Sequence, residues 1–157
     1  MTAAERTVAA MRVVAGGILA SVVATAGIAV YVRDTLLRPS PSPGLVDALL
    51  LGTVLVAGAS VAGHAVVRRQ VMAELRGRAP ELRGTSDPAS AAAPAYQRLT
   101  IVRAALTESP ALFAVVAYLA GGPGWLLAVP AVAAGLLVVA MPSRAALERL
   151  VEEALQA

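Results

Sequence analysis

Long apolar runs separated by short polar segments dominate the chain, and the first two runs are the clearest. Residues 13–32 (VVAGGILASVVATAGIAVYV) and 48–67 (ALLLGTVLVAGASVAGHAVV) contain no Asp, Glu, Lys or Arg. About 20 such residues cross the hydrocarbon core of a bilayer. The first run is longer than the apolar core of a signal peptide, and Arg33 and Asp34 follow it in place of a cleavage site. We therefore predict two retained transmembrane spans.

The second half of the chain predicts two further spans joined by a tight turn. The third covers residues 99–120, and the fourth covers residues 125–141, which is the lower limit of length for a crossing. Gly-Gly-Pro-Gly separates them, and Trp125 is expected at a membrane interface, where indole rings are enriched. The predicted fold class is all-α: a four-transmembrane-helix bundle forming one membrane domain over residues 1–157.

The polar segments predict a linker, a stiff connection and an amphipathic helix. Residues 79–94 are rich in Pro, Gly, Ser and Ala, so we expect a flexible cytoplasmic linker with little to bury. Three prolines within residues 38–44 make the connection between the first two spans short and stiff. Residues 144–155 repeat apolar side chains at helical spacing, which predicts an amphipathic C-terminal helix with Ser143 as its N-cap.

Arginine is distributed unevenly over the two sides of these spans. The amino end, the segment between the second and third spans, and the tail together carry eleven Arg, whereas the first connection carries only Arg33 and Arg38. Cytoplasmic segments of multi-pass proteins carry the excess of basic residues. All 13 basic residues are Arg, which with the excess of Ala, Gly and Pro is typical of GC-rich bacterial coding. We therefore predict a multi-pass protein of the bacterial inner (cytoplasmic) membrane with both termini in the cytoplasm.

Composition excludes several classes of function. Hydrophobic residues make up 58% of the chain and the mean hydropathy is +0.74, which is high for a soluble domain. Cysteine is absent and histidine occurs once, so we expect no disulfide, no metal site and no cofactor. A net charge of +3 raises the question of nucleic acid, but 3% aromatic residues are too few for base stacking. Without a nucleophile–base pair or a phosphate-binding loop, we also expect no enzyme.

Small residues spaced by four predict where helices approach closely. The first span offers Gly17, Ser21 and Thr25 on one face, and the second offers Ala59 and Gly63. Membrane helices associate through such faces because small side chains allow close van der Waals contact. We interpret both faces as packing seams, and a ligand-lining role is the alternative.

Glu108 is the one carboxylate of the third run and the first candidate for chemistry. It lies about 7 Å beyond Arg103 along a helix that rises 1.5 Å per residue. Ionised side chains within a membrane usually pair with one another. His64 is expected at a similar depth, and Arg12 in the same leaflet. We therefore expect Glu108 to point between helices and to meet His64, Arg12 or Arg103, either as a structural tie or as a proton site.

Pro110 adds polar groups to this candidate site. A proline inside a helix removes a backbone donor, which leaves the carbonyl of Leu106 without its helical partner. The hydroxyls of Thr107 and Ser109 are close enough in sequence to help satisfy the freed groups. We expect a continuous helix with a kink here, and a restart of the helix at Ser109 is the alternative.

Two resemblances bear on this region. The stretch AALTESPALFAVVAYLAGG, together with the exit MPSRAALERL, resembles an uncharacterised family of small four-helix bacterial integral membrane proteins, which implies the fold but no activity. The stretch AALTESPALF is also similar, more weakly, to the proton-carrying helix of rotary ATP synthase c subunits, which implies Glu108 as a carrier. The long polar segment before the third span departs from the short loop of those subunits.

The sequence thus favours a non-enzymatic accessory or interaction protein. Its expected partners are the lipid bilayer and either a second copy of the chain or another membrane protein, with no nucleic acid. The alternative is a proton- or ion-coupled carrier or subunit that uses Glu108.

Overall fold

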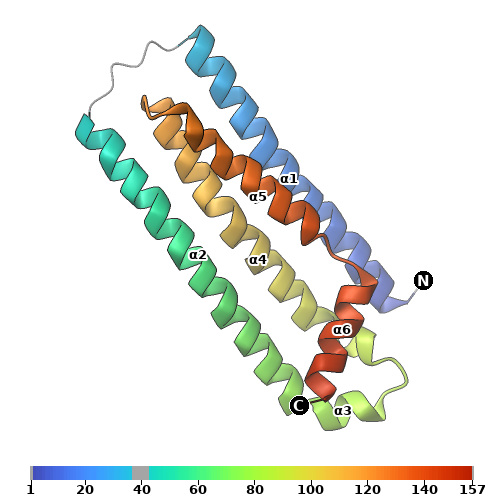
Figure 1. Cartoon of the computed structure of the whole chain (residues 1–157). Coiled ribbons are helices and arrows are strands. Elements are labelled where there is room, and N and C mark those ends of the chain that lie inside the picture. The colour runs from blue at the N-terminus through green and yellow to red at the C-terminus, as the bar shows by residue number, and fades with distance from the viewer. Residues whose placement is uncertain (1, 37–42, 157) are drawn as a thin grey trace.

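The structure, a computed structural model, describes residues 2–36 and 43–156, and it contains no strand in those ranges. The elements, labelled in Figure 1, are α1 (Ala3–Thr35), α2 (Pro43–Gly77), α3 (Ala79–Gly84), α4 (Pro88–Leu119), the 3₁₀ helix η1 (Gly124–Leu127), α5 (Ala128–Val139) and α6 (Arg144–Leu155). Arg38 and most of the proline-rich connection lie outside the described residues.

Three of these helices are long and apolar enough to cross a membrane, namely α1, α2 and α4. The η1–α5 segment passes the same test only together with α6, from which it is bent by 76°. The chain therefore has three to four candidate spans, which indicates a multi-pass membrane protein. The predicted runs 13–32 and 48–67 lie inside α1 and α2, and the run 99–120 lies in α4 except for its last residue. The run 125–141 forms most of η1 and the short helix α5, which ends at Val139.

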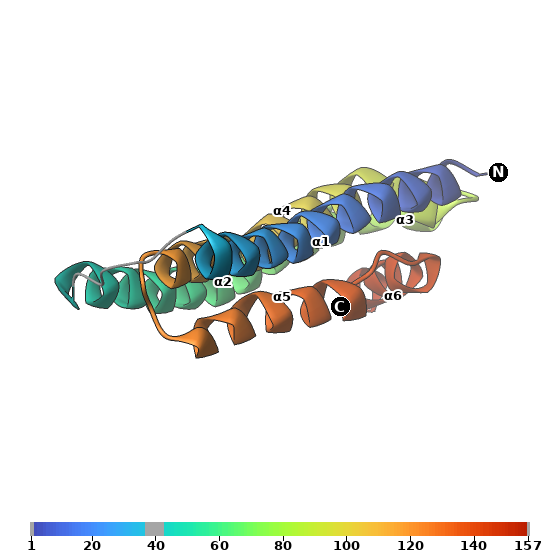
Figure 2. The ribbon, with the colours of Figure 1, turned by 90° about the horizontal axis from the view of Figure 1, so that it is seen from above.

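Helix α4 is the centre of the molecule. It packs against α2 on one side and α1 on the other, and α5 lies over α1 and α4 (Figure 1). Seen from above, α1, α4 and α2 form one layer while α5 and α6 form a second, shorter one (Figure 2). Since α5 makes its packing contacts with α1 and α4, a gap remains between α5 and α2.

The turn between α4 and η1 is fixed by glycine and by Arg33. Gly121 has φ 100°, a left-handed conformation that favours glycine. The Arg33 guanidinium donates to the carbonyls of Tyr118 and Gly122 at 2.7 and 2.6 Å, and it lies 4.1 Å from the centroid of the Tyr118 ring. These contacts satisfy carbonyls at the C-terminus of α4 and direct the chain back along α1.

The opposite end of the molecule holds the N-terminus, α3 and α6, and we call it the α6 end (Figure 1). The bend before α6 turns that helix across the ends of α1, α4 and α2. Its apolar stripe is buried there with Val71 and Leu75 of α2 and with Leu82 of α3. The predicted N-cap is confirmed, since Ser143 Oγ accepts from the backbone of Ala146 at 3.1 Å.

The expectation of a flexible linker over residues 79–94 is wrong. Residues 79–84 form α3, and α4 begins at Pro88 with Asp87 as its N-cap. Leu82 is completely buried, and Ala92 is equally inaccessible. This segment has few large apolar side chains, but its alanines are small enough to allow close helix packing at the α6 end.

The small-residue seams are only partly used. Gly17 and Ser21 are exposed and Thr25 is half-buried, because α1 packs through another face. The buried residues of that face are Ala4, Val8, Met11, Ala15, Val22 and Ala29. On α2, Ala59 is exposed, whereas a Cβ at Gly63 would lie 3.0 Å from Leu106 of α4. The seam on α2 therefore exists at Gly63, and the one expected on α1 does not form within the described part of this chain.

Candidate functional site

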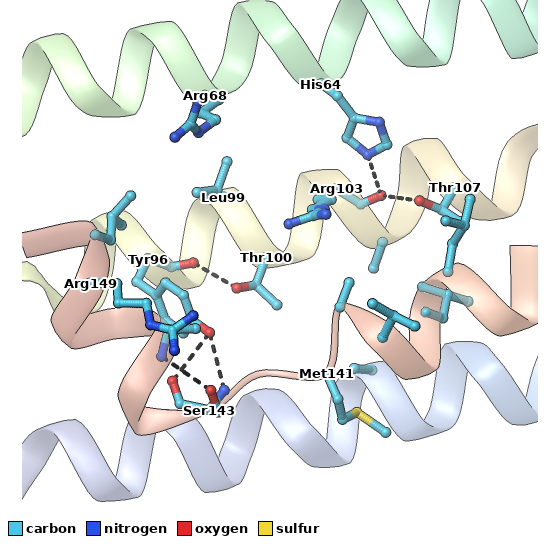
Figure 3. A pocket seen from close by; sticks show the side chains of 18 of the residues that line it. His64, Arg68, Tyr96, Leu99, Thr100, Arg103, Thr107, Met141, Ser143 and Arg149 are labelled. Atoms are coloured by element: carbon cyan, nitrogen blue, oxygen red, sulfur yellow. Dashed lines mark hydrogen bonds between the residues drawn. The ribbon is translucent and has the colours of Figure 1, made fainter. Parts of the chain in front are cut away.

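The gap between α2 and α5 widens at the α6 end into a pocket of about 860 Å³. Its walls are α2 on one side and the end of α5 with α6 on the other, and α4 forms its floor (Figure 3). The pocket exists because the chain bends before α6, so that α6 crosses toward α2 while α5 stays on the side of α1.

Three arginines from three helices surround this pocket: Arg68 of α2, Arg103 of α4 and Arg149 of α6 (Figure 3). Arg68 is paired, since its Nη2 lies 2.8 and 2.9 Å from the two carboxylate oxygens of Glu153. Among the described residues, Arg103 and Arg149 have no carboxylate within 4.0 Å. The pocket therefore carries two positive charges that no described carboxylate neutralises.

The uncharged polar groups of the pocket are engaged with the backbone. The carbonyl of Arg103 lies 3.0 Å from His64 Nε2 and accepts from Thr107 Oγ1 at 2.9 Å. Thr100 donates to the carbonyl of Tyr96 at 2.9 Å, and the Tyr96 hydroxyl accepts from the Ser143 backbone at 3.2 Å. These bonds hold the walls in place, and Arg103 and Arg149 remain as the charged groups available to a ligand.

One flank of the pocket is apolar and open. Ala65 and Val61 line it on α2, facing Leu136 and Val139 on α5. Val61 is 70% exposed and Val139 is 86% exposed. No other described part of the chain therefore covers the two rims of the gap. The pocket thus combines a basic end with an apolar side opening.

The structure brings together three of the six residues that the sequence singled out. His64, Arg103 and Thr107 meet at the carbonyl of Arg103. Arg12 lies elsewhere, where its Nε donates to the carbonyl of Pro142 at 2.9 Å and ties α1 to the bend before α6. Ser109 donates to the carbonyl of Ala105 at 2.9 Å.

The expected pair of Glu108 and His64 does not form. Among the described residues Glu108 makes no hydrogen bond or ion pair, and it does not line the pocket. Successive residues of a helix are turned by about 100°, so Glu108 faces away from the wall that Thr107 shares with His64. It lies instead on the side of α4 marked by the exposed residues Ile101 and Leu112.

The expected continuity of the helix at Pro110 is confirmed, whereas the expected role of the two hydroxyls is wrong. Helix α4 continues through Pro110, so it does not restart at Ser109. Neither Thr107 nor Ser109 donates to the carbonyl of Leu106, because each reaches back four residues along its own helix. Both hydroxyls therefore supplement existing turns of α4.

Among the pocket residues that sequence reasoning did not assign to a site are Arg68, Arg149 and Tyr96. Both arginines entered the sequence analysis only through the distribution of charge that predicts topology. The available signal was Pro142 with Ser143, since a proline followed by an N-cap ends one helix and starts another in a new direction. A bend there returns the tail to the arginine-rich ends of the spans.

Contacts at both ends of α6 hold it over the pocket. Arg144 bonds Glu5 of α1 at 3.1 Å and also Glu148 of its own helix at 2.7 Å. Arg83 donates to the carbonyl of Leu155 at 2.8 Å. The carboxylates of Glu148 and Glu5 raise the pKa of Arg144 above its ordinary value. The position of α6 therefore depends on contacts at both of its ends.

Other chemistry has little support in the described part of the chain. No group of three His, Cys, Asp or Glu side chains lies close enough together there to hold a metal ion. The chain matches no protein-family model, no curated protein and no solved structure. A functional assignment therefore rests on the geometry and charge of the pocket beside α6.

Proposed function

We propose that this chain is a non-enzymatic protein of the bacterial cytoplasmic membrane that binds an anionic ligand in the pocket beside α6. In this proposal α1, α2, α4 and η1–α5 are four spans, and both termini lie in the cytoplasm with α6. The observation that carries the proposal is the pair Arg103 and Arg149, two guanidinium groups that face one pocket without a described carboxylate partner.

The spacing of charges supports the membrane placement. No charged residue lies between Arg12 and Arg33, a distance of about 31 Å along α1, and none lies between Asp47 and Arg68, a similar distance along α2. The hydrocarbon core of a bilayer is about 30 Å thick. The two helices would therefore span it in register, with Arg68 and the pocket at the inner interface.

The engaged hydroxyls support a binding role over catalysis. A nucleophilic hydroxyl needs a base within hydrogen-bond reach. Thr100 and Thr107 instead donate to carbonyls of α4. Among the described residues that line the pocket, Glu153 is the one carboxylate, and it is held by Arg68. This arrangement favours an accessory or interaction protein that holds a ligand and leaves it unchanged.

Binding is tested with the purified protein in a neutral detergent at low ionic strength. Thermal unfolding is followed while soluble phosphoesters and anionic lipids are added one at a time. At least one anion should raise the Tm saturably in the wild type, and the double variant Arg103→Gln/Arg149→Gln should lose that response. Arg69→Gln/Arg76→Gln, which removes two exposed charges outside the pocket, should keep it. An equal response in both double variants would overturn the proposal.

The alternative function, proton or ion coupling through Glu108, has one observation in its favour. Glu108 is half-buried within α4 and makes no hydrogen bond or ion pair with any described residue. Protein in liposomes with a pH-sensitive dye in the lumen tests this function. Proton flux in the wild type that disappears in Glu108→Gln supports it, whereas identical traces for the two proteins exclude it.

A further inference from the structure

The pocket has an open apolar flank on one side, and α6 crosses its other end. Its apolar flank lies between α2 and α5, whose rims Val61 and Val139 are largely exposed. Its other end is crossed by α6, with Leu147 and Leu150 buried beneath that helix. The bidentate pair of Arg68 and Glu153 joins α6 to α2 there. The apolar flank is therefore a route by which a lipid could enter the pocket from the side.

The charge of the pocket indicates the headgroup. Because Glu153 neutralises Arg68, the charge left over is that of Arg103 and Arg149. A phosphate monoester carries about −1.5 to −2 at neutral pH, whereas a phosphodiester carries a single negative charge. Guanidinium groups bind phosphate oxygens through paired hydrogen bonds. The monoester is therefore the headgroup that matches two arginines.

We propose, building on the function proposed above, that the ligand is a phospholipid with a phosphomonoester headgroup, which enters the pocket sideways between α2 and α5. Its phosphate lies between Arg103 and Arg149. One acyl chain follows the apolar flank past Ala65 and Leu136 toward the membrane interior. Basic pockets between membrane helices on the cytoplasmic side are known to hold anionic headgroups.

The depth of the pocket fits this orientation. Arg68 is the charged residue that ends the uncharged stretch of α2 at the α6 end, and Arg103 of α4 lines the same pocket. Val61 lies about 10 Å deeper than Arg68 along α2. A lipid with its phosphate at the arginines would therefore have its first methylene groups beside Ala65 and the next ones beside Val61.

The experiment compares four ligands on the wild-type protein in dodecyl maltoside. These are phosphatidic acid, phosphatidylglycerol and phosphatidylcholine with the same chains, and glycerol 3-phosphate, which is the headgroup without chains. The apparent Kd is taken from the saturable rise in Tm. Phosphatidic acid should bind about 10-fold more tightly than phosphatidylglycerol. Phosphatidylcholine and glycerol 3-phosphate should produce no saturable shift.

A matched pair of variants tests the side opening. Ala65→Trp places an indole in the flank, whereas Ala62→Trp places one on an exposed face of α2 outside the pocket. We expect Ala65→Trp to weaken phosphatidic acid binding about 10-fold or more and Ala62→Trp to leave it unchanged. Equal affinity in these two variants would refute lateral access.

The outcomes separate this inference from the function on which it rests. If glycerol 3-phosphate binds as tightly as phosphatidic acid and needs Arg103 and Arg149, the ligand is soluble, and the lipid inference fails while the proposed function stands. If phosphatidylglycerol binds as tightly as phosphatidic acid, the match of charge to headgroup is wrong. If no anion binds in a manner that needs the two arginines, both proposals fail.

Discussion

At the scale of single residues, Glu153 is an internal competitor for the ligand. Its carboxylate occupies the guanidinium of Arg68, the third arginine of the pocket. The pair is exposed, so its net contribution to stability is small, about 0–1 kcal/mol. An anion in the pocket can bind Arg68 only if the ion pair between Arg68 and Glu153 breaks. We therefore expect the affinity of the wild type to be lower than three available arginines would give.

Removing the Glu153 charge should consequently strengthen binding. We expect Glu153→Gln to lower the Kd for phosphatidic acid about 3- to 10-fold, because Arg68 becomes available to the phosphate. Glu152→Gln, which removes the neighbouring exposed carboxylate, is the control and should change the Kd by less than about 2-fold. Weaker binding in Glu153→Gln alone would mean that the pair supports the pocket and does not compete with the ligand.

Asp87 gives the α6 end a dependence on pH. Hydrogen bonds from the hydroxyl and the backbone of Ser90 lower the pKa of Asp87 below its ordinary value of 3.8. A carboxyl group with a lowered pKa stabilises the fold fully above the ordinary value, and this contribution is lost as the pH falls through the lowered pKa. Asn caps helices about as well as Asp but does not titrate.

We therefore expect Asp87→Asn to match the wild type near neutral pH and to lose less stability in acid. The Tm of both proteins is measured from about pH 6 down to about pH 2.5. The wild type should fall further, by a few degrees, only below the ordinary pKa of 3.8. A difference in Tm that stays constant over this range would show that the cap does not depend on the charge of Asp87.

The role of a single residue could be predicted from the sequence where it depends only on the residues next to it in the chain. Ser143 was predicted as an N-cap because it follows a proline and precedes a helical repeat, and its hydroxyl fills that role. The partner of Glu108 was not predictable in the same way. Depth along a helix follows from residue number, but the side to which a residue faces depends on which neighbours cover that helix.

At the scale of elements, the contact between α2 and α4 depends on Gly63. A Cβ built at this position lies 3.0 and 3.3 Å from the terminal methyl carbons of Leu106. A larger side chain would push the two helices apart over the stretch that positions His64 beside the carbonyl of Arg103. Gly58 lies on the same helix with no atom within 4 Å of its added Cβ.

These two glycines form a matched test of the seam. We expect Gly63→Val to destabilise the folded protein by about 1–3 kcal/mol, since inserting bulk into a tight contact forces the backbone to shift. Gly58→Val makes the same substitution in open space and should have little effect. Unfolding of the two variants in detergent gives the comparison. Equal losses of stability would mean that valine acts through helix propensity and not through packing.

The positions of the helices could be predicted only where an apolar run borders charged residues. The apolar runs inside α1 and α2 are flanked by charges, so their positions followed directly from the sequence. Residues 79–94 lack such a boundary, and their alanines were taken for linker. In the structure, Ala92 and Ala95 pack with Tyr96 beneath α6, a contact that depends on chain segments far apart in the sequence.

At the scale of the whole molecule, the η1–α5 segment is the shortest of the candidate spans. Its residues cover about 26 Å, somewhat less than the hydrocarbon core. Its neighbours nevertheless determine where it ends. Helix α6 packs with α2 and α1 at the α6 end, whereas the turn before η1 lies beside Arg33 at the opposite end. If α1 and α2 cross the membrane, η1–α5 must cross it too.

This topology makes a prediction that single cysteines can check, because the native chain has none. Leu36→Cys, Glu81→Cys and Gln156→Cys each place a thiol at an exposed position, the first at one end of the molecule and the other two at the α6 end. In intact cells, a membrane-impermeant maleimide should label only Leu36→Cys. All three should react after the cells are permeabilised. Labelling of Glu81→Cys in intact cells would reverse the proposed orientation. Labelling of Gln156→Cys together with Leu36→Cys, but not of Glu81→Cys, would mean that η1–α5 does not cross and that the pocket beside α6 cannot form in the membrane.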